Sequence, residues 1–345
     1  MSFTFTEATN AMERKLAEPT FTDALMLDYG SPRMAAFFAE MDAVVPWADL
    51  AASIADVFDD DSDSDKGGRP HWPVVLMVKC LMLQKWFGLS DPGLEEMLRD
   101  RLSFRRFVGL SMDEQTPDET TFVRFRGRLV ARGHGSTLFD AVRRVLEQRG
   151  VIVNAGTLVD ASVQQASRGR WSRAADEGAE LHTQDKAASN TRLYGRTLFG
   201  FKGHIATDVR GFARDYRFDT AATHESRHFE ELTAEEAKAV WADKGYWNID
   251  RVARLTLRGV FAGIANRRVR GQAKLTPRQR AHNRLVAKVR FVVEHPFAWM
   301  KARGWGRARY RGLARNGFDF ALTLAACNLH RARDLLLAQR ALANA

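Results

Sequence analysis

The chain has 345 residues and a formal net charge of +10, with a sequence pI near 9.9. Its 45% hydrophobic and 27% charged content is typical of a globular protein with room for two domains. The sequence has no apolar run of about 18 residues and no secretory leader, which predicts a cytoplasmic protein without membrane contact. Cys80 and Cys327 stand in apolar patterns, so we expect buried thiols rather than a disulfide scaffold or a zinc site.

The charge is unevenly distributed along the chain. Residues 1–65 carry 3 Lys and Arg against 14 Asp and Glu, whereas the remainder carries 49 against 28. A strongly basic body is the footprint of nucleic-acid binding, although a ribosome-like or membrane-surface role would share it.

The N-terminal part is expected to be an acidic helical segment followed by a linker, over residues 1–65. The acidic run at 59–68, DDDSDSDKGG, imitates the start of a calcium loop. However, Lys66 stands where that loop needs Gly, and Trp72 stands where it needs a bidentate Glu. We therefore interpret the run as a solvated linker.

Residues 66–149 are predicted to form a helical DNA-binding region. An apolar helix should end near Gly88, and Ser90 or Asp91 should cap the next one. Further helices are expected at residues 103–108, after a cap at 117–121, and at 136–149. Their arginine-bearing faces favour a helix-turn-helix arrangement, but an ordinary bundle with solvated arginines explains the spacing equally well.

Residues 150–345 change from helical to alternating patterns. Strands are predicted at 151–166, 197–208 and 212–223, followed by a helix at 224–239 and an irregular excursion at 167–196 between the first two strands. A strand at 239–243, a helix at 248–259, a strand at 260–266 and closing helices complete the order. This order predicts a mixed α/β sheet flanked by helices, as in a ribonuclease-H-like domain.

Three acids distant in sequence are placed to converge at one edge of that sheet. Asp160 would lie in the first strand, Asp243 at the end of the fourth, and Glu294 on the helix packed across the sheet. Three carboxylates without a histidine base suit two Mg²⁺ ions, for which Mn²⁺ would substitute. The same pair of ions could serve hydrolysis and then strand transfer.

The stretch from 283 to 303 carries the third acid. Arg290, Glu294 and Lys301 should share one helical face, opposite an apolar stripe, with a kink or helix restart just after Glu294 because of Pro296. An incidental surface ion pair is the alternative explanation. However, residues 266–311 hold 14 Lys and Arg and this single acid, which favours a metal ligand acting on a polyanion.

The run HESRH at 224–228 matches the H-E-x-x-H pattern of zinc proteases. Because it follows a strand directly, we expect His224 and Glu225 to occupy the cap and first turn of a helix instead. The chain also has no phosphate-binding loop and no dinucleotide fingerprint.

Taken together, the motifs resemble a known family. They are GRPHWP, PDETTFVRFR, GTLVDAS, FGFKGHIATD, WADKGYW, GIANR and VRFVVEHPFAWMK, and their order is similar to that of a bacterial DDE transposase of the insertion-sequence-five family, within the insertion-sequence-four group. The resemblance implies that Asp160, Asp243 and Glu294 are the catalytic, metal-binding acids. Arg290 and Lys301 match the last basic positions of the group's signature, but its tyrosine position holds Ala287.

The resemblance also implies what this protein binds and does. A transposase would bind the terminal inverted repeats of its element, cut at the element ends and join the 3′ hydroxyls to target DNA, as a homodimer or higher assembly. Arg290 and Lys301 would contact DNA, and the basic loop with Arg267, Arg268 and Arg270 is a further candidate. Two alternatives are a non-catalytic DNA-binding protein and a nuclease that cleaves without strand transfer.

Overall fold

The computed structural model describes residues 13–18, 20, 31–62, 70–153, 155–167, 185–193, 195–236 and 238–343. The chain forms two compact units, one of residues 1–141 with 333–345 and one of residues 142–332. The finer division at residues 65 and 149 stays a prediction.

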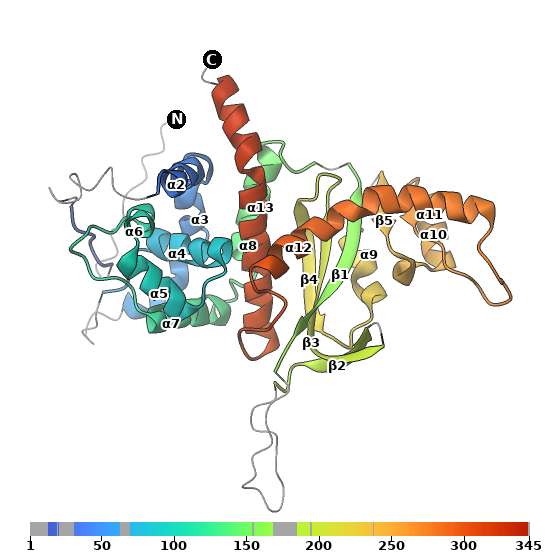
Figure 1. The fold of residues 1–345 in the computed structure, drawn as a ribbon, viewed down its shortest axis with the longest axis horizontal. Coiled ribbons are helices and arrows are strands. Elements are labelled where there is room, and N and C mark those ends of the chain that lie inside the picture. The colour runs from blue at the N-terminus through green and yellow to red at the C-terminus, as the bar shows by residue number, and fades with distance from the viewer. Residues whose placement is uncertain are drawn as a thin grey trace, which may run out of the picture. The chain divides into compact units, whose positions relative to one another are not determined.

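The N-terminal unit is helical, as predicted (Figure 1). Its helices are α2 Pro32–Val44, α3 Trp47–Ala52, η1 Ala55–Ser62, α4 Val74–Phe87, α5 Asp91–Asp100, α6 Leu102–Val108 and α7 Glu119–Ala131. Helices α8 Thr137–Gln148 and α13 Leu313–Ala343 each contribute to both units. The predicted linker overlaps η1 as far as Ser62, and the rest of it lies almost wholly outside the described residues.

The helix ends follow from local chemistry. Gly88 ends α4 with φ 67°, a conformation that costs glycine little because it has no Cβ. Ser90 Oγ accepts a hydrogen bond from the Gly93 N–H at the start of α5, at 3.1 Å. These positions agree with the expected boundaries, because a cap is determined by residues within one turn.

The C-terminal unit is built on a mixed, six-stranded sheet. The strands are β1 Thr157–Gln165, β2 Ser189–Leu193, β3 Arg196–Thr207, β4 Ala213–Thr220, β5 Ala239–Ala242 and β6 Phe261–Ile264. Their order is β2-β3-β1-β5-β6, and β4 also pairs with β3. Strands β2, β1 and β4 pair antiparallel to β3, whereas β5 is parallel to both β1 and β6. The predicted mixed sheet of a ribonuclease-H-like domain is therefore confirmed.

Two elements differ from the prediction. Strand β2 lies within the segment expected to be irregular, and it pairs with the N-terminal half of β3. The helix expected at 224–239 is only η3 Glu225–His228 followed by α9 Phe229–Leu232. It stops early because the Glu236 carboxylate accepts hydrogen bonds from Thr157 Oγ1 and the Lys238 N–H, which turns the chain into β5.

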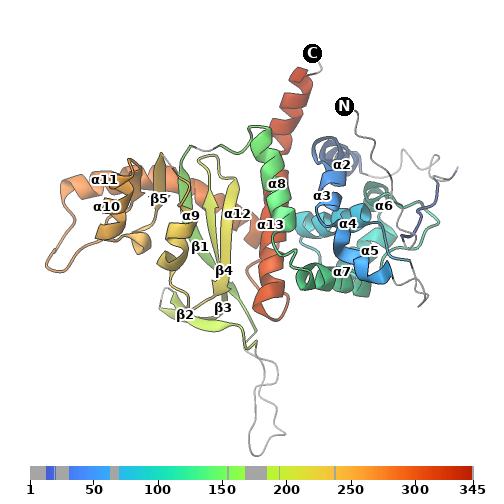
Figure 2. The ribbon, with the colours of Figure 1, turned by 180° about the vertical axis from the view of Figure 1, so that it is seen from behind.

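Helices cover both faces of the sheet (Figures 1 and 2). On one face, α9 and α10 Ile249–Leu257 pack on a buried cluster that includes Val159, Val240 and Leu255. On the other face, α13 approaches so closely that a Cβ on Gly203 would lie 2.5 Å from Phe320. Only glycine fits at that point of β3.

The segment that carries the third acid is broken into three pieces. They are α11 Pro277–Arg290, η5 Phe291–Val293 and α12 Glu294–Ala302. The expected restart is present, but it falls just before Glu294 rather than after it. Pro296 is the third residue of α12, and N–H groups in the first turn of a helix have no helical acceptor, so proline is tolerated there. The break instead takes the form of the 3-10 turn η5, directly before Glu294.

Candidate active site

The positions of two of the acids, Asp160 and Asp243, are determined by the register of the parallel strands β1 and β5. Asp160 lies in β1, and its preceding residue Val159 pairs with Ala242, the last residue of β5. The next residue after Ala242 is Asp243, which begins the short helix η4 Lys244–Tyr246. Because β1 and β5 run in the same direction, Asp160 and Asp243 lie at the same edge of the sheet.

Arg290 joins the first acid to the third. Its Nη1 lies 3.4 Å from Asp160 Oδ2, and its Nη2 lies 3.3 Å from Glu294 Oε1. The Asp160 side chain is 22% exposed, whereas that of Glu294 is 59% exposed. One guanidinium therefore holds together two carboxylates that are 134 positions apart in sequence.

The protonation of Asp160 reflects this crowded setting. Burial raises the pKa of its carboxyl to about 6, against the opposing effects of Arg290 and of a hydrogen bond from the Ala161 N–H. The carboxylates of Glu225 and Glu294 raise this pKa further, by smaller amounts. A bound cation would favour the charged form and offset these effects.

Two further residues, Tyr246 and Glu225, interact electrostatically with Asp160. Tyr246, at the end of η4, is fully buried, and its hydroxyl has no hydrogen-bond partner. Burial, then the charges of Asp160 and Glu225, raise the pKa of this hydroxyl well above its usual value. The motif WADKGYW could have identified Tyr246, whereas Glu225 had been considered only as part of HESRH.

The side chains near Asp160 differ in how well their grouping and their chemistry suit a divalent ion. Among the residues described, no three His, Cys, Asp or Glu side chains are grouped closely enough to hold a metal between them. The side chains that do approach one another offer carboxylate oxygens, which suit Mg²⁺ or Mn²⁺. A bound cation would lower the raised pKa of Asp160 and favour its charged form. The residues therefore fit such an ion chemically.

Of the basic residues predicted to contact DNA, four are exposed and Arg290 is half-buried; the exposed ones are Lys301, Arg267, Arg268 and Arg270. Lys301 lies in the last turn of α12. In the loop between β6 and α11, the Arg267 guanidinium lies over the Trp247 ring, 5.5 Å from its centroid. Since Trp247 directly follows η4, Arg267 lies beside the turn that carries Asp243. Arg268 donates to the Ala273 carbonyl at 3.2 Å. The Arg270 side chain is exposed.

The HESRH run forms the N-cap and the four residues of the short 3-10 helix η3, not the middle of an α-helix. His224 is the N-cap of η3, where its ring accepts a hydrogen bond from the Ser226 N–H, as expected for a residue at a helix start. His228 Nε2 lies 3.4 Å from Asp219. The two histidines therefore have different local partners, and the run lacks the continuous helix that a zinc protease motif needs.

The arginines of the N-terminal unit divide into two groups. Arg105 is buried and donates to the carbonyls of Ser111 and Glu114. Arg126 is also buried and pairs with Asp91. These two side chains support the bundle, so they are neither solvated nor part of an open DNA-binding face.

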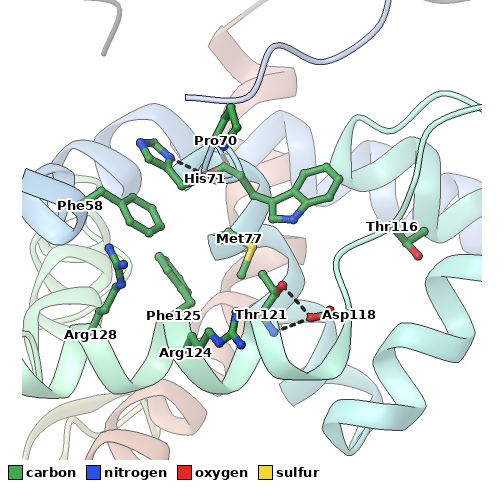
Figure 3. Close-up of a pocket in the computed structure, with 11 residues that line it drawn as sticks. Phe58, Pro70, His71, Met77, Thr116, Asp118, Thr121, Arg124, Phe125 and Arg128 are labelled. Carbon is green, nitrogen blue, oxygen red and sulfur yellow. Dashed lines mark hydrogen bonds between the residues drawn. The ribbon is translucent and has the colours of Figure 1, made fainter. Parts of the chain in front are cut away.

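Other cations of this unit border a hollow of about 210 Å³ (Figure 3). Arg124 and Arg128, from α7, line it together with aromatic rings. The rings of Phe58 and His71 stack with centroids 4.0 Å apart. Asp118 accepts a hydrogen bond from the Thr121 N–H at 2.7 Å and so fixes the start of α7 beside the hollow.

A mixed sheet with Asp160 within β1 and Asp243 directly after the parallel strand β5 is typical of a ribonuclease-H-like catalytic domain of the DDE type. Residues 155–329 match the Transposase DDE domain family, and residues 26–128 match the Transposase domain family (DUF772). The first match covers just over half of the chain, so the protein belongs to the DDE transposase family. No solved structure matches it.

Family membership implies transposase or nuclease activity and DNA binding, and DDE transposases generally use divalent metal ions. Among the described residues, no helix is both long and apolar enough to cross a membrane.

Proposed function

We propose that this protein is a transposase of the insertion-sequence-five type that acts on the ends of its own element. It binds the terminal inverted repeats, cuts the DNA there and joins the freed 3′ hydroxyls to target DNA. The observation that carries this proposal is the Arg290 bridge between Asp160 and Glu294, beside the strand end that precedes Asp243. A chain that kept only DNA binding would have no need of this arrangement.

Asp160, Asp243 and Glu294 are the residues that would hold two Mg²⁺ ions. Bound there, the ions would activate the attacking oxygen and stabilise the leaving oxygen of the phosphodiester. Arg290 keeps the Asp160 and Glu294 carboxylates near each other while they share its positive charge. In the presence of DNA, the same guanidinium is a donor for phosphate oxygens, which it can bind in a bidentate manner.

Basic residues near the acids would hold the DNA end. Lys301 and the loop residues Arg267, Arg268 and Arg270 are exposed, and the ring contact of Arg267 with Trp247 supports a position close to the cleavage site. Contacts of this kind bind phosphates and position the duplex without selecting its sequence.

Helix α7 is our candidate for the element that contacts the inverted repeat in the N-terminal unit. Arg124 is exposed, Val123 is 53% exposed, and a Cβ added to Gly127 would meet nothing within 4 Å. An open helical face with a cation and an apolar side chain suits phosphate and base contacts in a groove. A homodimer or a higher assembly on DNA would bring two ends together.

The distinguishing experiment separates binding from cutting. Purified protein is incubated with a labelled duplex carrying the element's end, in Mg²⁺ or in EDTA, and Glu294→Gln is compared with wild type. We expect Glu294→Gln to bind the duplex almost normally and to lose cleavage, because a neutral amide is a poorer ligand for Mg²⁺.

The matched control is Glu235→Gln, an exposed glutamate in the turn after α9. It should cut like the wild type. Unchanged cleavage by Glu294→Gln would refute the metal-ligand assignment, while binding without metal-dependent cleavage by the wild type would favour the non-catalytic alternative.

A further inference from the structure

The buried hydroxyl of Tyr246 calls for an explanation. Its side chain has no exposed surface and its oxygen has no partner, although a buried hydroxyl left unsatisfied is costly. The charged groups that act on it are Asp160, Glu225, Arg290 and Asp243. The space around the hydroxyl is therefore within reach of the charges of three carboxylates and of the bridging arginine.

Glu225 is held at this space by the fold. Its Oε2 lies 3.0 Å from where a Cβ on Gly245 would stand, so the carboxylate lies directly against the turn that links Asp243 to Tyr246. Arg251 ties the two turns together. Its Nη1 donates to the Tyr246 carbonyl at 2.5 Å, and its Nη2 donates to the Ser226 carbonyl at 3.2 Å.

The charge of Glu225 is not balanced by a direct contact. Within the described part of the chain, the carboxylates of Glu225 and Asp243 make no hydrogen bond or ion pair. The nearby cation Lys202 instead donates to the Thr223 carbonyl at 2.9 Å. Arg290 already pairs with Asp160 and Glu294, so among the described residues neither Glu225 nor Asp243 has a cation in direct contact.

We propose that Glu225 is a fourth acidic ligand of the divalent-cation site, and that the Tyr246 hydroxyl positions its carboxylate. A cation there would supply the charge that the protein does not provide, and the hydroxyl would then have a carboxylate to which it can donate. The inference rests on the proposed function, because it adds a residue to the same metal site.

The test measures metal binding without relying on DNA cleavage. Mn²⁺ is titrated into the full-length protein and the free ion is followed by electron paramagnetic resonance, for wild type, Glu225→Gln and Asp243→Asn. Glu225→Gln should weaken Mn²⁺ binding about 10-fold, as is usual when a ligand or its support is lost. Its thermal midpoint should stay near that of the wild type, because the carboxylate has no structural partner to lose.

The exposed Glu235→Gln serves as the charge-matched control and should bind Mn²⁺ normally. Wild-type affinity in Glu225→Gln together with weakened binding in Asp243→Asn would overturn the role of Glu225 and leave the proposed function intact. If the wild type bound no Mn²⁺, with or without the DNA end, both the role of Glu225 and the proposed function would be refuted.

A second variant addresses the positioning role. Tyr246→Phe removes only the hydroxyl, so a purely structural tyrosine would leave Mn²⁺ affinity unchanged. We expect weaker Mn²⁺ binding together with an equal or higher thermal midpoint, because the variant no longer buries an unsatisfied oxygen. Unchanged Mn²⁺ affinity in Tyr246→Phe would overturn the positioning role.

Discussion

At the scale of single residues, Asp160 illustrates how a residue proposed to bind metal can oppose stability. Its carboxyl is mostly buried, and burial is the main reason why its pKa rises to about 6. The side chain would be easier to accommodate as an uncharged group, but metal binding needs the charged form. The structure thus holds a carboxylate whose ionisation is favoured by a cation.

This difference predicts a pH dependence in the absence of metal. The folded-state pKa of about 6 lies above the unfolded value of about 3.9, so the folded protein binds more protons between these values and loses stability as the pH rises through them. Asp160→Asn removes this loss. In EDTA, its free energy of unfolding relative to wild type should rise by about 1 kcal/mol between pH 5 and pH 7.5.

Urea denaturation of both proteins at the two pH values measures this change. The free energies of unfolding of wild type and Asp160→Asn could differ by the same amount at pH 5 and pH 7.5. That result would show that the pKa of Asp160 is not raised in the folded protein.

Lys301 allows a prediction about DNA contact. This exposed side chain in the last turn of α12 should bind a phosphate of the element's end. Lys301→Ala should therefore weaken end binding and lower the slope of log affinity against log salt by about 1. Fluorescence anisotropy over a series of salt concentrations measures both quantities. Lys301→Arg keeps the charge and should retain the slope, and an unchanged slope in Lys301→Ala would contradict the contact.

At the scale of elements, α7 separates arginines that support the fold from those available to DNA. Arg126 is buried against Asp91, while Arg124, two residues earlier on the same helix, is exposed. Arg126→Ala should destabilise the protein by about 3 to 5 kcal/mol, because it leaves the Asp91 charge without its partner. Arg124→Ala should fold normally but bind the element's end less tightly.

Thermal denaturation and end binding by anisotropy measure the two effects. Arg99→Ala is the surface control, since Arg99 is 66% exposed and pairs with Glu95 on α5. Equal end binding by Arg124→Ala, Arg99→Ala and wild type would exclude α7 as the contact helix.

The elements also show which parts of the fold a sequence can predict. Helix ends such as Gly88 and Ser90 were predicted because their causes lie within one turn. Strand β2, with the sequence SNTRL, has no apolar alternation and owes its conformation to pairing with β3. The short α9 ends early because Glu236 accepts a hydrogen bond from Thr157, 79 residues away in sequence. Such long-range contacts leave no local pattern.

The candidate site was predictable to a similar degree. The spacing of Arg290 and Glu294 predicted that they share a helical face, and they form an ion pair across the short η5. The second half of the bridge, from Arg290 to Asp160, depends on how the chain crosses the sheet and could not be predicted from spacing. The approach of Glu225 to the turn at Gly245 was missed for the same reason.

At the scale of the whole molecule, the sequence separates an acidic start from a basic body, and the structure forms two compact units. The two family matches, one over 26–128 and the other over 155–329, both describe transposase domains. Our account assigns recognition of the element's end to the helical unit and the chemistry to the sheet unit. Both tasks are needed for transposition, whereas a general nuclease would need only the second.

The most direct test of this account is a complete reaction in vitro. Purified protein is mixed with a labelled duplex carrying the element's own end and with a target plasmid, in Mg²⁺ or EDTA, and wild type is compared with Asp243→Asn. We predict Mg²⁺-dependent cutting at the end and joining of the 3′ hydroxyl to the plasmid, both lost in Asp243→Asn. Tight binding by the wild type without cleavage in either condition would contradict the account. Cleavage without joining would show that the protein is a nuclease rather than a transposase.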